Sequence, residues 1–396
     1  MKLIRIFFLT ILFLTNGVLA FCQTIHVSIF NESPVKRVVV SALKGNYQVI
    51  GDSSFVMDLS ANDALYLSMS GQKITLHSSS KPVGMFSNIR FEAADTASVL
   101  RINPVSPNLD ARQYNDNLIV SVAFKRILLV NEVNIDNYVA GVVESEAGAN
   151  AEPEFYKAQA VLARTYLFGN TDRHTSEGFQ LCDGVHCQAY NGRSARNLSI
   201  PTATKATKGM VVAAFDSTFI TAVFHANCGG ETESASNAWL NGKNYLVPVK
   251  DPFCINSPAA HWHKTIPLSQ WKTYLKSHGF KLPAGTSPGA FDCSQISRKQ
   301  FYRIGDDSLP FKQIRTDFQL RSSFFSVIAG TEEVTLKGRG FGHGVGLCQE
   351  GAMQMAKIGY KYDEILNYYF KNISIVDVNS AHIKKAPANQ PLLSKK

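Results

Sequence analysis

The sequence predicts an α+β protein, in which an antiparallel β-rich N-terminal region precedes a mixed domain that contains several helices. Short runs rich in β-branched and aromatic residues, separated by Gly, Asn, Asp and Ser, occupy the chain from Thr24 to about Val130. Helical spacing of apolar residues begins near Asn134 and returns in several later segments. The 396 residues are 45% hydrophobic and 18% charged, which is typical of a globular protein with a substantial core.

The first twenty residues have the composition of a secretory signal. Lys2 and Arg5 precede a short apolar run, and a small-residue pattern typical of a cleavage site ends at Ala20. The apolar run is short for a membrane span, and we expect no transmembrane span in the mature protein. We therefore expect export to the periplasm or cell envelope. Cys22 leaves a lipoprotein as an alternative, which the bulky Phe21 before it disfavours.

The charge of the chain bears on its partners. The formal net charge is +9, with two basic residues in the signal segment and four lysines in the tail. Without these six residues the net charge of the chain is about +3, which argues against nucleic acid as a partner. A mildly basic exported protein with a basic tail is suited to bind an anionic cell-wall polymer. An equally good explanation is a basic surface that only keeps the protein in solution.

Two helices are predicted after the β-rich region. Asp136 is suited to cap a helix over 136–146. A proline begins the second, over 153–168, and Gly-Asn ends it. On this second helix Lys157 and Arg164 lie seven residues apart, which is two turns, so both should project from one face.

The rest of the chain alternates loops with regular elements, and no internal repeat is present. A polar loop follows the second helix, and the last residues are expected to be disordered. The predicted elements are a helix over 201–208, strands over 210–215 and 220–230, an irregular lid or subdomain over 258–321, a hairpin over 324–338 and two closing helices over 350–359 and 362–370.

A glycine-rich stretch, GRGFGHGVGLCQEGA, covers residues 338–352 and has glycine at every second position up to 346. Neither a dinucleotide fingerprint nor a phosphate-binding loop fits this spacing. An extended backbone with this pattern would present bare peptide on one side, where another backbone or a polymer ligand could approach closely. Tight internal packing is the alternative, but His343 in the middle of the stretch favours a site.

Two acidic residues, Glu144 and Glu146, end the first predicted helix. Residues two apart on a helix diverge by about 200°, so these carboxylates do not form a facing pair. A solvated helix end is the more common explanation of such neighbours. Apolar neighbours could instead bury one of them and raise its pKa, as a general acid requires. Glu231 and Glu233 are the next candidates for a general acid.

Four potential metal ligands, His174, Cys182, His186 and Cys187, lie within fourteen residues. Two cysteines and two histidines are enough for a tetrahedral zinc site, although the spacing is not that of a standard zinc finger. A Cys182–Cys187 disulfide is the alternative in an exported protein, and both interpretations remain open here.

The segment over 224–254 gathers aromatic and glycine residues, among them His225, Trp239 and Tyr245. Exposed aromatic side chains would suit stacking on sugar rings, although buried ones are more common. Cys228 and Cys254 are a candidate disulfide. Because the chain has seven cysteines, at least one stays unpaired or binds something.

Four stretches together resemble the stage II sporulation protein D family, whose members are peptidoglycan lytic transglycosylases. They are NYVAGVVESEA, FYKAQAVLARTY, FHANCGGETES and GRGFGHGVGLCQEGAMQMAKIGY, in the family's order, and the likeness covers about Tyr114 to Ile375. Each piece alone would be a weak signal. The resulting organisation is a signal peptide over 1–20, a β-rich domain over 21–113, a catalytic domain over 114–380 and a basic tail over 381–396.

The resemblance implies that Glu146 is the catalytic acid and that Lys157 and Arg164 support it. Some members bind zinc between the second and third motifs, which strengthens a structural zinc ion at the histidine and cysteine residues named above. Cys348 stands where the family usually has Ser, and Ala147 where it usually has Met; both loosen the inference about substrate. The candidate substrate-binding residues are Gln188, Tyr190, His225, Trp239, Tyr245, His343 and Gln349.

A lytic transglycosylase needs only one carboxyl group. That group protonates the glycosidic oxygen and then takes the proton of the sugar's own C6 hydroxyl as an anhydro ring closes. We expect an exported enzyme that cleaves the MurNAc–GlcNAc bond of peptide-stripped peptidoglycan beside a cell-wall amidase. The alternatives are a glycan-binding modifier of such an amidase that does not cut, and a zinc hydrolase, which four protein ligands on the metal disfavour.

Overall fold

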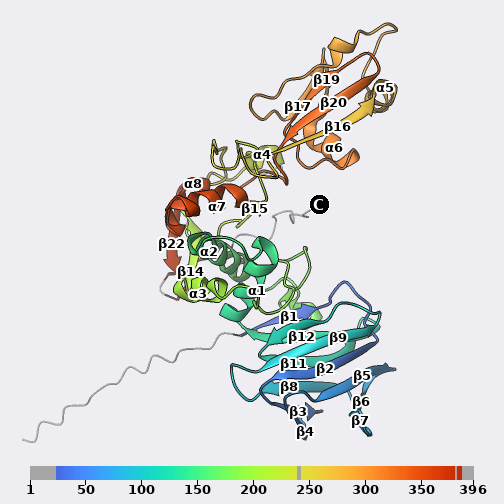
Figure 1. The fold of residues 1–396 in the computed structure, drawn as a ribbon, viewed down its shortest axis with the longest axis vertical. Coiled ribbons are helices and arrows are strands. Elements are labelled where there is room, and N and C mark those ends of the chain that lie inside the picture. Colours follow the sequence, from blue (N-terminus) through green and yellow to red (C-terminus); the bar gives the residue numbers. More distant parts are fainter. Residues whose placement is uncertain (1–23, 239–241, 380, 386–396) are drawn as a thin grey trace, which may run out of the picture.

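The computed structural model describes residues 24–238, 242–379 and 381–385, and it confirms the α+β class. Figure 1 shows three parts along the long axis of the molecule: a β layer, a helical layer and a smaller subdomain of strands and helices. The predicted signal peptide, Cys22 and Trp239 lie outside the described residues.

The β layer consists of two sheets that pack against each other. The larger has the order β13-β1-β12-β11-β8-β3-β4 and the smaller β10-β9-β2-β5-β6-β7. The strands are β1 (Thr24–Ile29), β2 (Arg37–Lys44), β3 (Tyr47–Gly51), β4 (Ser54–Leu59), β5 (Ala64–Ser70), β6 (Lys73–His77), β7 (Pro82–Phe86), β8 (Asn88–Ala93), β9 (Val99–Ser106), β10 (Arg112–Asn115), β11 (Asn117–Ala123), β12 (Arg126–Asn134) and β13 (Leu181–Cys182).

Period-two burial explains why these segments form sheets. In β2, Val38, Val40 and Ala42 are buried while the residues between them are partly exposed, as expected for strands with one face on a core. β11 contacts β6 and β12 contacts β5 across the two sheets. The predicted boundary between residues 113 and 114 falls inside β10. The β layer continues to Asn134, because β11 and β12 lie between β8 and β1 in the larger sheet.

Two features join the β layer to the helical layer. β12 runs directly into helix α1 (Ile135–Ala147), with Asn134 between them as the N-cap. The Asn134 side chain accepts from the backbone N–H of Asp136, so the predicted cap at Asp136 is wrong by two residues. Further along the chain, β13 returns to pair with β1 in parallel, with Ser28 opposite Cys182.

The helical layer is built around α2 (Pro153–Gly169), which contacts four other helices. Eleven of its seventeen residues are buried, and Pro153 occupies its first turn as predicted. Two short sheets, β14 with β22 and β15 with β21, complete the layer. The other elements are η1 (Thr175–Glu177), α3 (Ser199–Ala206), β14 (Met210–Ala214), β15 (Phe224–His225), α4 (Ala235–Ala238), β21 (Leu347–Cys348), α7 (Gln349–Lys357), α8 (Tyr362–Tyr369) and β22 (Ile373–Asp377).

The third part is a subdomain, in line with the lid or subdomain predicted over 258–321, but it contains regular strands and helices where an irregular chain was predicted. Its buried aromatic residues, such as Trp271 and Tyr302, form a core separate from that of the other two layers. The predicted hairpin is present and pairs with a third strand. The elements are β16 (His261–Pro267), α5 (Leu268–Ser277), η2 (Pro288–Phe291), β17 (Phe301–Ile304), β18 (Asp307–Pro310), α6 (Phe311–Asp317), β19 (Phe325–Ala329) and β20 (Glu333–Arg339).

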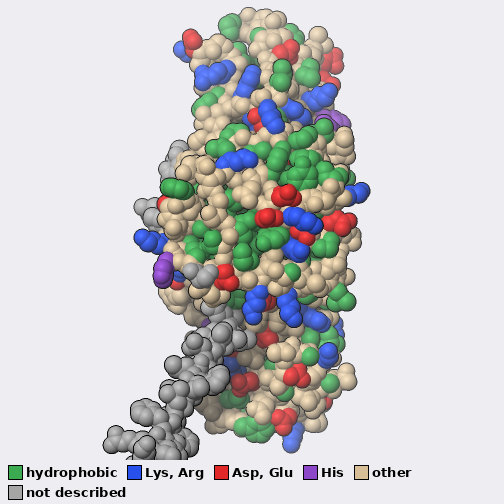
Figure 2. All heavy atoms as spheres, turned by 90° about the vertical axis from the view of Figure 1, so that its left-hand side faces the viewer, with side chains coloured by type: hydrophobic (Ala, Val, Ile, Leu, Met, Phe, Trp, Pro, Cys, Tyr) green, Lys and Arg blue, Asp and Glu red, His purple; other side chains and the backbone are tan. Residues whose placement is uncertain are grey.

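The described start of the C-terminal tail is paired, although disorder was predicted from residue 381. The backbone of Lys384 exchanges hydrogen bonds with Ser217 and Phe219, and Lys385 forms an ion pair with Asp172 at 2.6 Å. On the face shown in Figure 2, basic and acidic side chains are interspersed with apolar ones.

No helix within the described residues has both the length and the apolar character needed to cross a bilayer.

Candidate functional site

Glu146 lies in the last turn of α1 and is half-buried. Its Oε1 accepts a hydrogen bond from the backbone N–H of Ala189 at 3.0 Å. Its backbone carbonyl accepts from Nε2 of Gln349, the first residue of α7, at 3.2 Å. Two of the predicted site residues, Glu146 and Gln349, are therefore neighbours although 203 positions separate them in the chain.

The loop over 189–197 wraps around the end of α1 and fixes it. The Ser145 hydroxyl accepts from the backbone N–H of Asn191 at 3.0 Å, one position before Glu146. The side-chain amide of Asn197 donates to the carbonyl of Ala149 at 2.7 Å, just after the helix ends. The backbone around Glu146 is thus held from both sides.

Glu144, and not Glu146, is the buried carboxylate of the pair. It accepts from the hydroxyl of Ser194, from the backbone N–H groups of Ala195 and Arg196, and from the Arg196 guanidinium. Burial by itself would raise the pKa of Glu144, but these donors outweigh it and lower the pKa below its ordinary value. The expectation that burial would turn one of the two acids into a proton donor is therefore wrong for the buried one.

We expect Glu144→Gln to lower the free energy of unfolding by about 1–3 kcal/mol at pH 7, because it leaves several donors poorly satisfied. The pKa of Glu144 is lower in the folded state than its ordinary value of 4.5. Its contribution is therefore complete above that value and is lost as the pH falls through the folded-state pKa. Urea unfolding from pH 7 to pH 3 should show the gap to wild type narrowing at acid pH. A difference in unfolding free energy that does not change with pH would contradict this prediction. An equal decrease in unfolding free energy in Glu332→Gln, the exposed control, would also contradict it.

A cavity of about 750 Å³ opens beside the end of α1. Its walls are the connection from α1 to α2, Asn197, the loop over 252–258 and one side of α7 along its whole length. Glu350 lines it and accepts from the side chains of Asn227 at 2.5 Å and Ser257 at 2.6 Å. Asn150, four residues after Glu146, also lines it. The side chain of Glu146 is not part of this lining, which begins four residues further along the chain.

Lys157 and Arg164, the predicted supporting residues, form their hydrogen bonds and ion pairs with residues other than Glu146. Arg164 is 1% exposed and donates to the carbonyls of Thr204 and Thr207 and to Asp136. Lys157 forms an ion pair with Glu154 at 2.7 Å, at the side of α2 that packs on α8. The two residues share a helical face, but α3 and β14 cover its C-terminal half, so Arg164 is a buried structural residue.

Four of the predicted substrate-binding side chains are buried in the core: Gln188, Tyr190, His225 and Tyr245. The hydroxyl of Tyr190 donates to Asn131 at 2.8 Å, and its ring packs against Tyr138. The structure thus places these side chains away from the surface, and both tyrosine hydroxyls find hydrogen-bond partners within the core. Burial lowers the pKa of His225 well below its ordinary value, so its imidazole stays neutral.

The glycines of the glycine-rich stretch pack closely against neighbouring chain segments, although Phe341 in the same stretch is exposed. Gly340 and Gly346 have φ values of 78° and 72°, in the left-handed region that glycine tolerates best. A Cβ on Gly346 would lie 2.3 Å from the carbonyl oxygen of Val223. The ring nitrogens of His343 hydrogen-bond the backbone of Phe224 and Val345, at 3.0 and 3.1 Å. The alternative of tight internal packing therefore holds.

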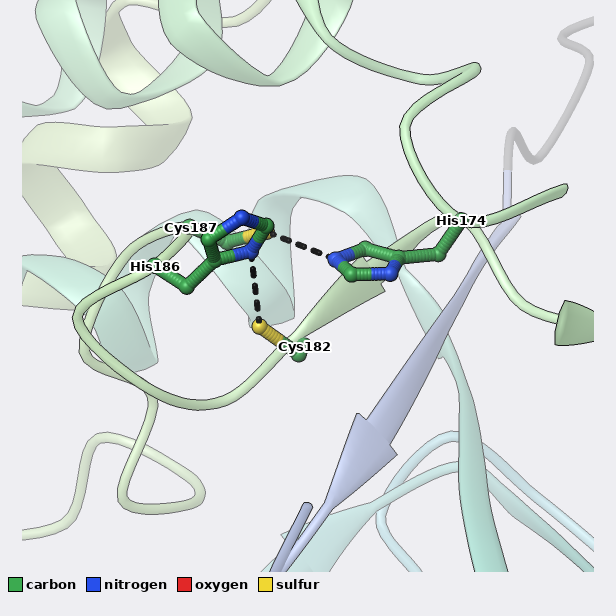
Figure 3. Close-up of side chains that lie close together, drawn as sticks. All are labelled: His174, Cys182, His186 and Cys187. Carbon is green, nitrogen blue, oxygen red and sulfur yellow. Dashed lines mark hydrogen bonds between the residues drawn. The ribbon is translucent and has the colours of Figure 1, made fainter. Parts of the chain in front are cut away.

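The predicted metal ligands His174, Cys182, His186 and Cys187 come together, with one ligand atom of each within 4.8 Å of the others. Figure 3 shows the four side chains facing a common centre. The Sγ of Cys187 lies 3.5 Å from Nε2 of His174, and both thiols are free. The other ring nitrogen of His174 hydrogen-bonds Glu177 at 2.5 Å, as histidine ligands of metals commonly do. This donor set fits a tetrahedral zinc ion.

The second predicted disulfide, Cys228–Cys254, is not formed. The two sulfur atoms are 3.4 Å apart, well beyond a disulfide bond of about 2.05 Å. Cys348 and Asp251 complete a second cluster with them. This cluster was not predicted from the sequence, because its residues come from separate segments and only the Asp-x-x-Cys spacing at 251–254 hints at it. The hydrogen-bond donors to Glu144 were not predicted either, because they too come from a separate segment.

Comparisons with known proteins identify a family model and several relatives that the chain resembles. A family model described as Stage II sporulation protein matches residues 123–213, which include α1, α2 and the histidine–cysteine cluster. An uncharacterised protein of Brachyspira hyodysenteriae is 30% identical over 278 residues, covering 69% of this chain and 73% of that protein. Stage II sporulation protein D of Bacillus subtilis is 29% identical over 267 residues, covering 63% and 77%. An amidase enhancer of Bacillus subtilis is 26% identical over 290 residues, covering 59% and 40%.

Proposed function

The chain belongs to the stage II sporulation protein D family, and from this premise we propose that it is an exported, cell-wall-associated lytic transglycosylase. Its substrate would be the MurNAc–GlcNAc bond of peptidoglycan, and its product a 1,6-anhydro-MurNAc end. The observation that carries the proposal is the position of Glu146, half-buried in the last turn of α1, held by Ala189 and Gln349, and four residues before Asn150, which lines the cavity.

Glu146 would act twice in one turnover. As a carboxylic acid it gives its proton to the glycosidic oxygen, and that bond breaks. As a carboxylate it then takes the proton of the C6 hydroxyl of the same muramyl residue, whose oxygen bonds to C1. Because the attacking hydroxyl belongs to the substrate, it has a high effective concentration and no carboxylate is needed to position water.

The surroundings of the other acids support a single catalytic carboxyl group. Glu144 is held ionised by its hydrogen-bond donors. Glu231 forms an ion pair with Lys250 at 3.1 Å, and Glu233 with Arg298 at 3.5 Å. These three carboxylates are engaged within the protein, and so is Glu350, an acid that lines the cavity and accepts hydrogen bonds from Asn227 and Ser257.

We also propose that His174, Cys182, His186 and Cys187 hold a structural zinc ion. With four protein ligands, such an ion would supply coordination that fixes the chain, and no open position for chemistry. The cluster is joined to the β layer through β13, and the loop that bonds Glu146 begins two residues after Cys187. A metal here would therefore hold the loop over 189–197 against the end of α1.

Loss of this site should destabilise the protein strongly. We expect Cys182→Ser to bind about one zinc ion fewer per chain and to lose about 4 kcal/mol or more of unfolding free energy, the range for a lost structural metal. Metal analysis and urea unfolding, with Cys293→Ser as control, measure both effects. Cys293 lies outside both clusters. An unchanged metal content and stability in Cys182→Ser would contradict the proposal.

Mass spectrometry of digests tests the reaction itself. A lytic transglycosylase leaves a muramyl end one water lighter than the end that a hydrolase leaves. Digests of intact and of peptide-stripped glycan strands show which substrate is used, and we expect faster release from the stripped strands. Hydrated ends would identify a hydrolase instead.

The likeness to an amidase enhancer supports one alternative, a wall-binding modifier of a cell-wall amidase. Such a protein would release no glycan fragments alone but would increase the rate at which an amidase removes stem peptides. Assays with glycan alone and with amidase added separate the two functions.

A further inference from the structure

A second cluster of metal-binding side chains lies in the core of the helical layer. It consists of Cys228, Asp251, Cys254 and Cys348, each of which is 0% exposed. One ligand atom of each lies within 4.8 Å of the others. Cys228 lies three residues after β15, Asp251 and Cys254 lie in the loop over 251–254, and Cys348 is the last residue before α7.

The distances within the cluster fit shared ligands. The Sγ atoms of Cys228 and Cys254 are 3.4 Å apart, and the Sγ of Cys228 is 3.1 Å from Oδ2 of Asp251. Thiolates on one tetrahedral zinc ion, with Zn–S near 2.3 Å, lie about 3.8 Å from each other. The observed separation is much closer to that value than to a disulfide bond.

From this geometry we propose that Cys228, Asp251, Cys254 and Cys348 bind a second zinc ion through three sulfur atoms and one carboxylate oxygen. Soft thiolates favour Zn²⁺ among the common divalent ions, and four protein ligands close its coordination, which makes the site structural.

The acidic groups of the cluster also support the binding of a cation. Three thiols and one carboxyl group crowd a site that is removed from water. A divalent cation offsets this crowding and lets all four groups be deprotonated. Outside the cluster, the guanidinium of Arg298 donates to the carbonyl of Cys228 at 2.8 Å and brings a further positive charge nearby.

The ligands are oriented by neighbouring donors, as metal ligands commonly are. The hydroxyl of Tyr369 donates to Oδ2 of Asp251 at 2.9 Å, and the backbone N–H of Phe253 donates to its Oδ1 at 3.0 Å. The backbone N–H of Cys228 donates to the sulfur of Cys348 at 3.3 Å. These contacts leave the ligand atoms facing one another.

The site would tie two walls of the cavity together. The loop over 252–258 forms one wall and helix α7 forms another, and both are attached to ligands. Gln349, which contacts the carbonyl of Glu146, directly follows the ligand Cys348. The ion would therefore set the position of α7 relative to the end of α1.

Zinc content of the full-length protein and its variants tests the proposal. With Zn²⁺ supplied during expression, we expect the wild type to hold two zinc ions per chain, and Cys348→Ser and Cys182→Ser to hold one each. Cys293→Ser is the matched control and should keep two. Zinc lost in Cys348→Ser but kept in Cys182→Ser would support this site even if the histidine–cysteine cluster binds none.

A second measurement on the wild type needs no variant to fold. After denaturation with chelator and without reductant, peptide mapping should find Cys228, Cys254 and Cys348 all alkylated. A Cys228–Cys254 disulfide would leave those two unmodified and would overturn the proposal. Zinc content that is the same in wild type and in a folded Cys348→Ser variant would overturn it as well.

Discussion

Glu146→Gln should lower the rate of glycan cleavage by about 10²–10⁴-fold, the usual contribution of a general acid. The amide can still accept the hydrogen bond from the backbone N–H of Ala189, so the end of α1 should keep its structure. What it loses is the proton that the leaving oxygen needs and the base that receives the proton of the C6 hydroxyl.

The measurement is the initial rate at which anhydro-muramyl ends appear from peptide-stripped glycan, with thermal unfolding recorded for each preparation. Glu332→Gln makes the same change of charge at an exposed position in the subdomain and should keep the wild-type rate. Full activity in Glu146→Gln would refute the proposed mechanism. Loss of activity together with loss of folding would show that Glu146 supports the structure.

Arg164→Ala should lower the free energy of unfolding by about 3–5 kcal/mol, the range for breaking a buried, hydrogen-bonded ionic group. Its guanidinium joins α2 to the end of α3 and to the start of α1 through the carbonyls of Thr204 and Thr207 and through Asp136. Truncation leaves those acceptors without their donor inside the core.

Lys157→Ala is the comparison, because the two residues share a face of α2 but only Arg164 is buried. A half-buried pair such as Lys157–Glu154 should contribute no more than about 1 kcal/mol. Urea unfolding measures both variants. If Arg164→Ala were as stable as wild type and had lost only activity, the guanidinium would belong to the site after all.

Local patterns predicted most of the secondary structure but not how the elements face each other. The helices over 135–147 and 153–169 and the β-rich start follow from apolar periodicity and were predicted from it. Periodicity also placed Lys157 and Arg164 on one face. It could not show that α3 and β14 cover only part of that face, because those elements approach from elsewhere in the chain.

The candidate site was predictable to the extent that it is local. The histidine–cysteine cluster lies within one short loop and was identified from spacing. The glycine-rich stretch was misjudged because alternating glycines fit both an extended strand and a chain of positive φ angles, and sequence does not distinguish the two. The second cysteine cluster joins residues up to 120 positions apart, so only the fold reveals it.

The two separate cores have a consequence for how the molecule opens. The β layer and the helical layer share one apolar core and are joined by both the β12–α1 junction and the β1–β13 pairing. We therefore expect the core amide protons of these two layers to exchange together, as one cooperative unit. The subdomain over 261–339 has its own core, so we expect its amide protons to exchange through a separate opening, in which the contacts of Arg298 with Cys228 and Glu233 also break.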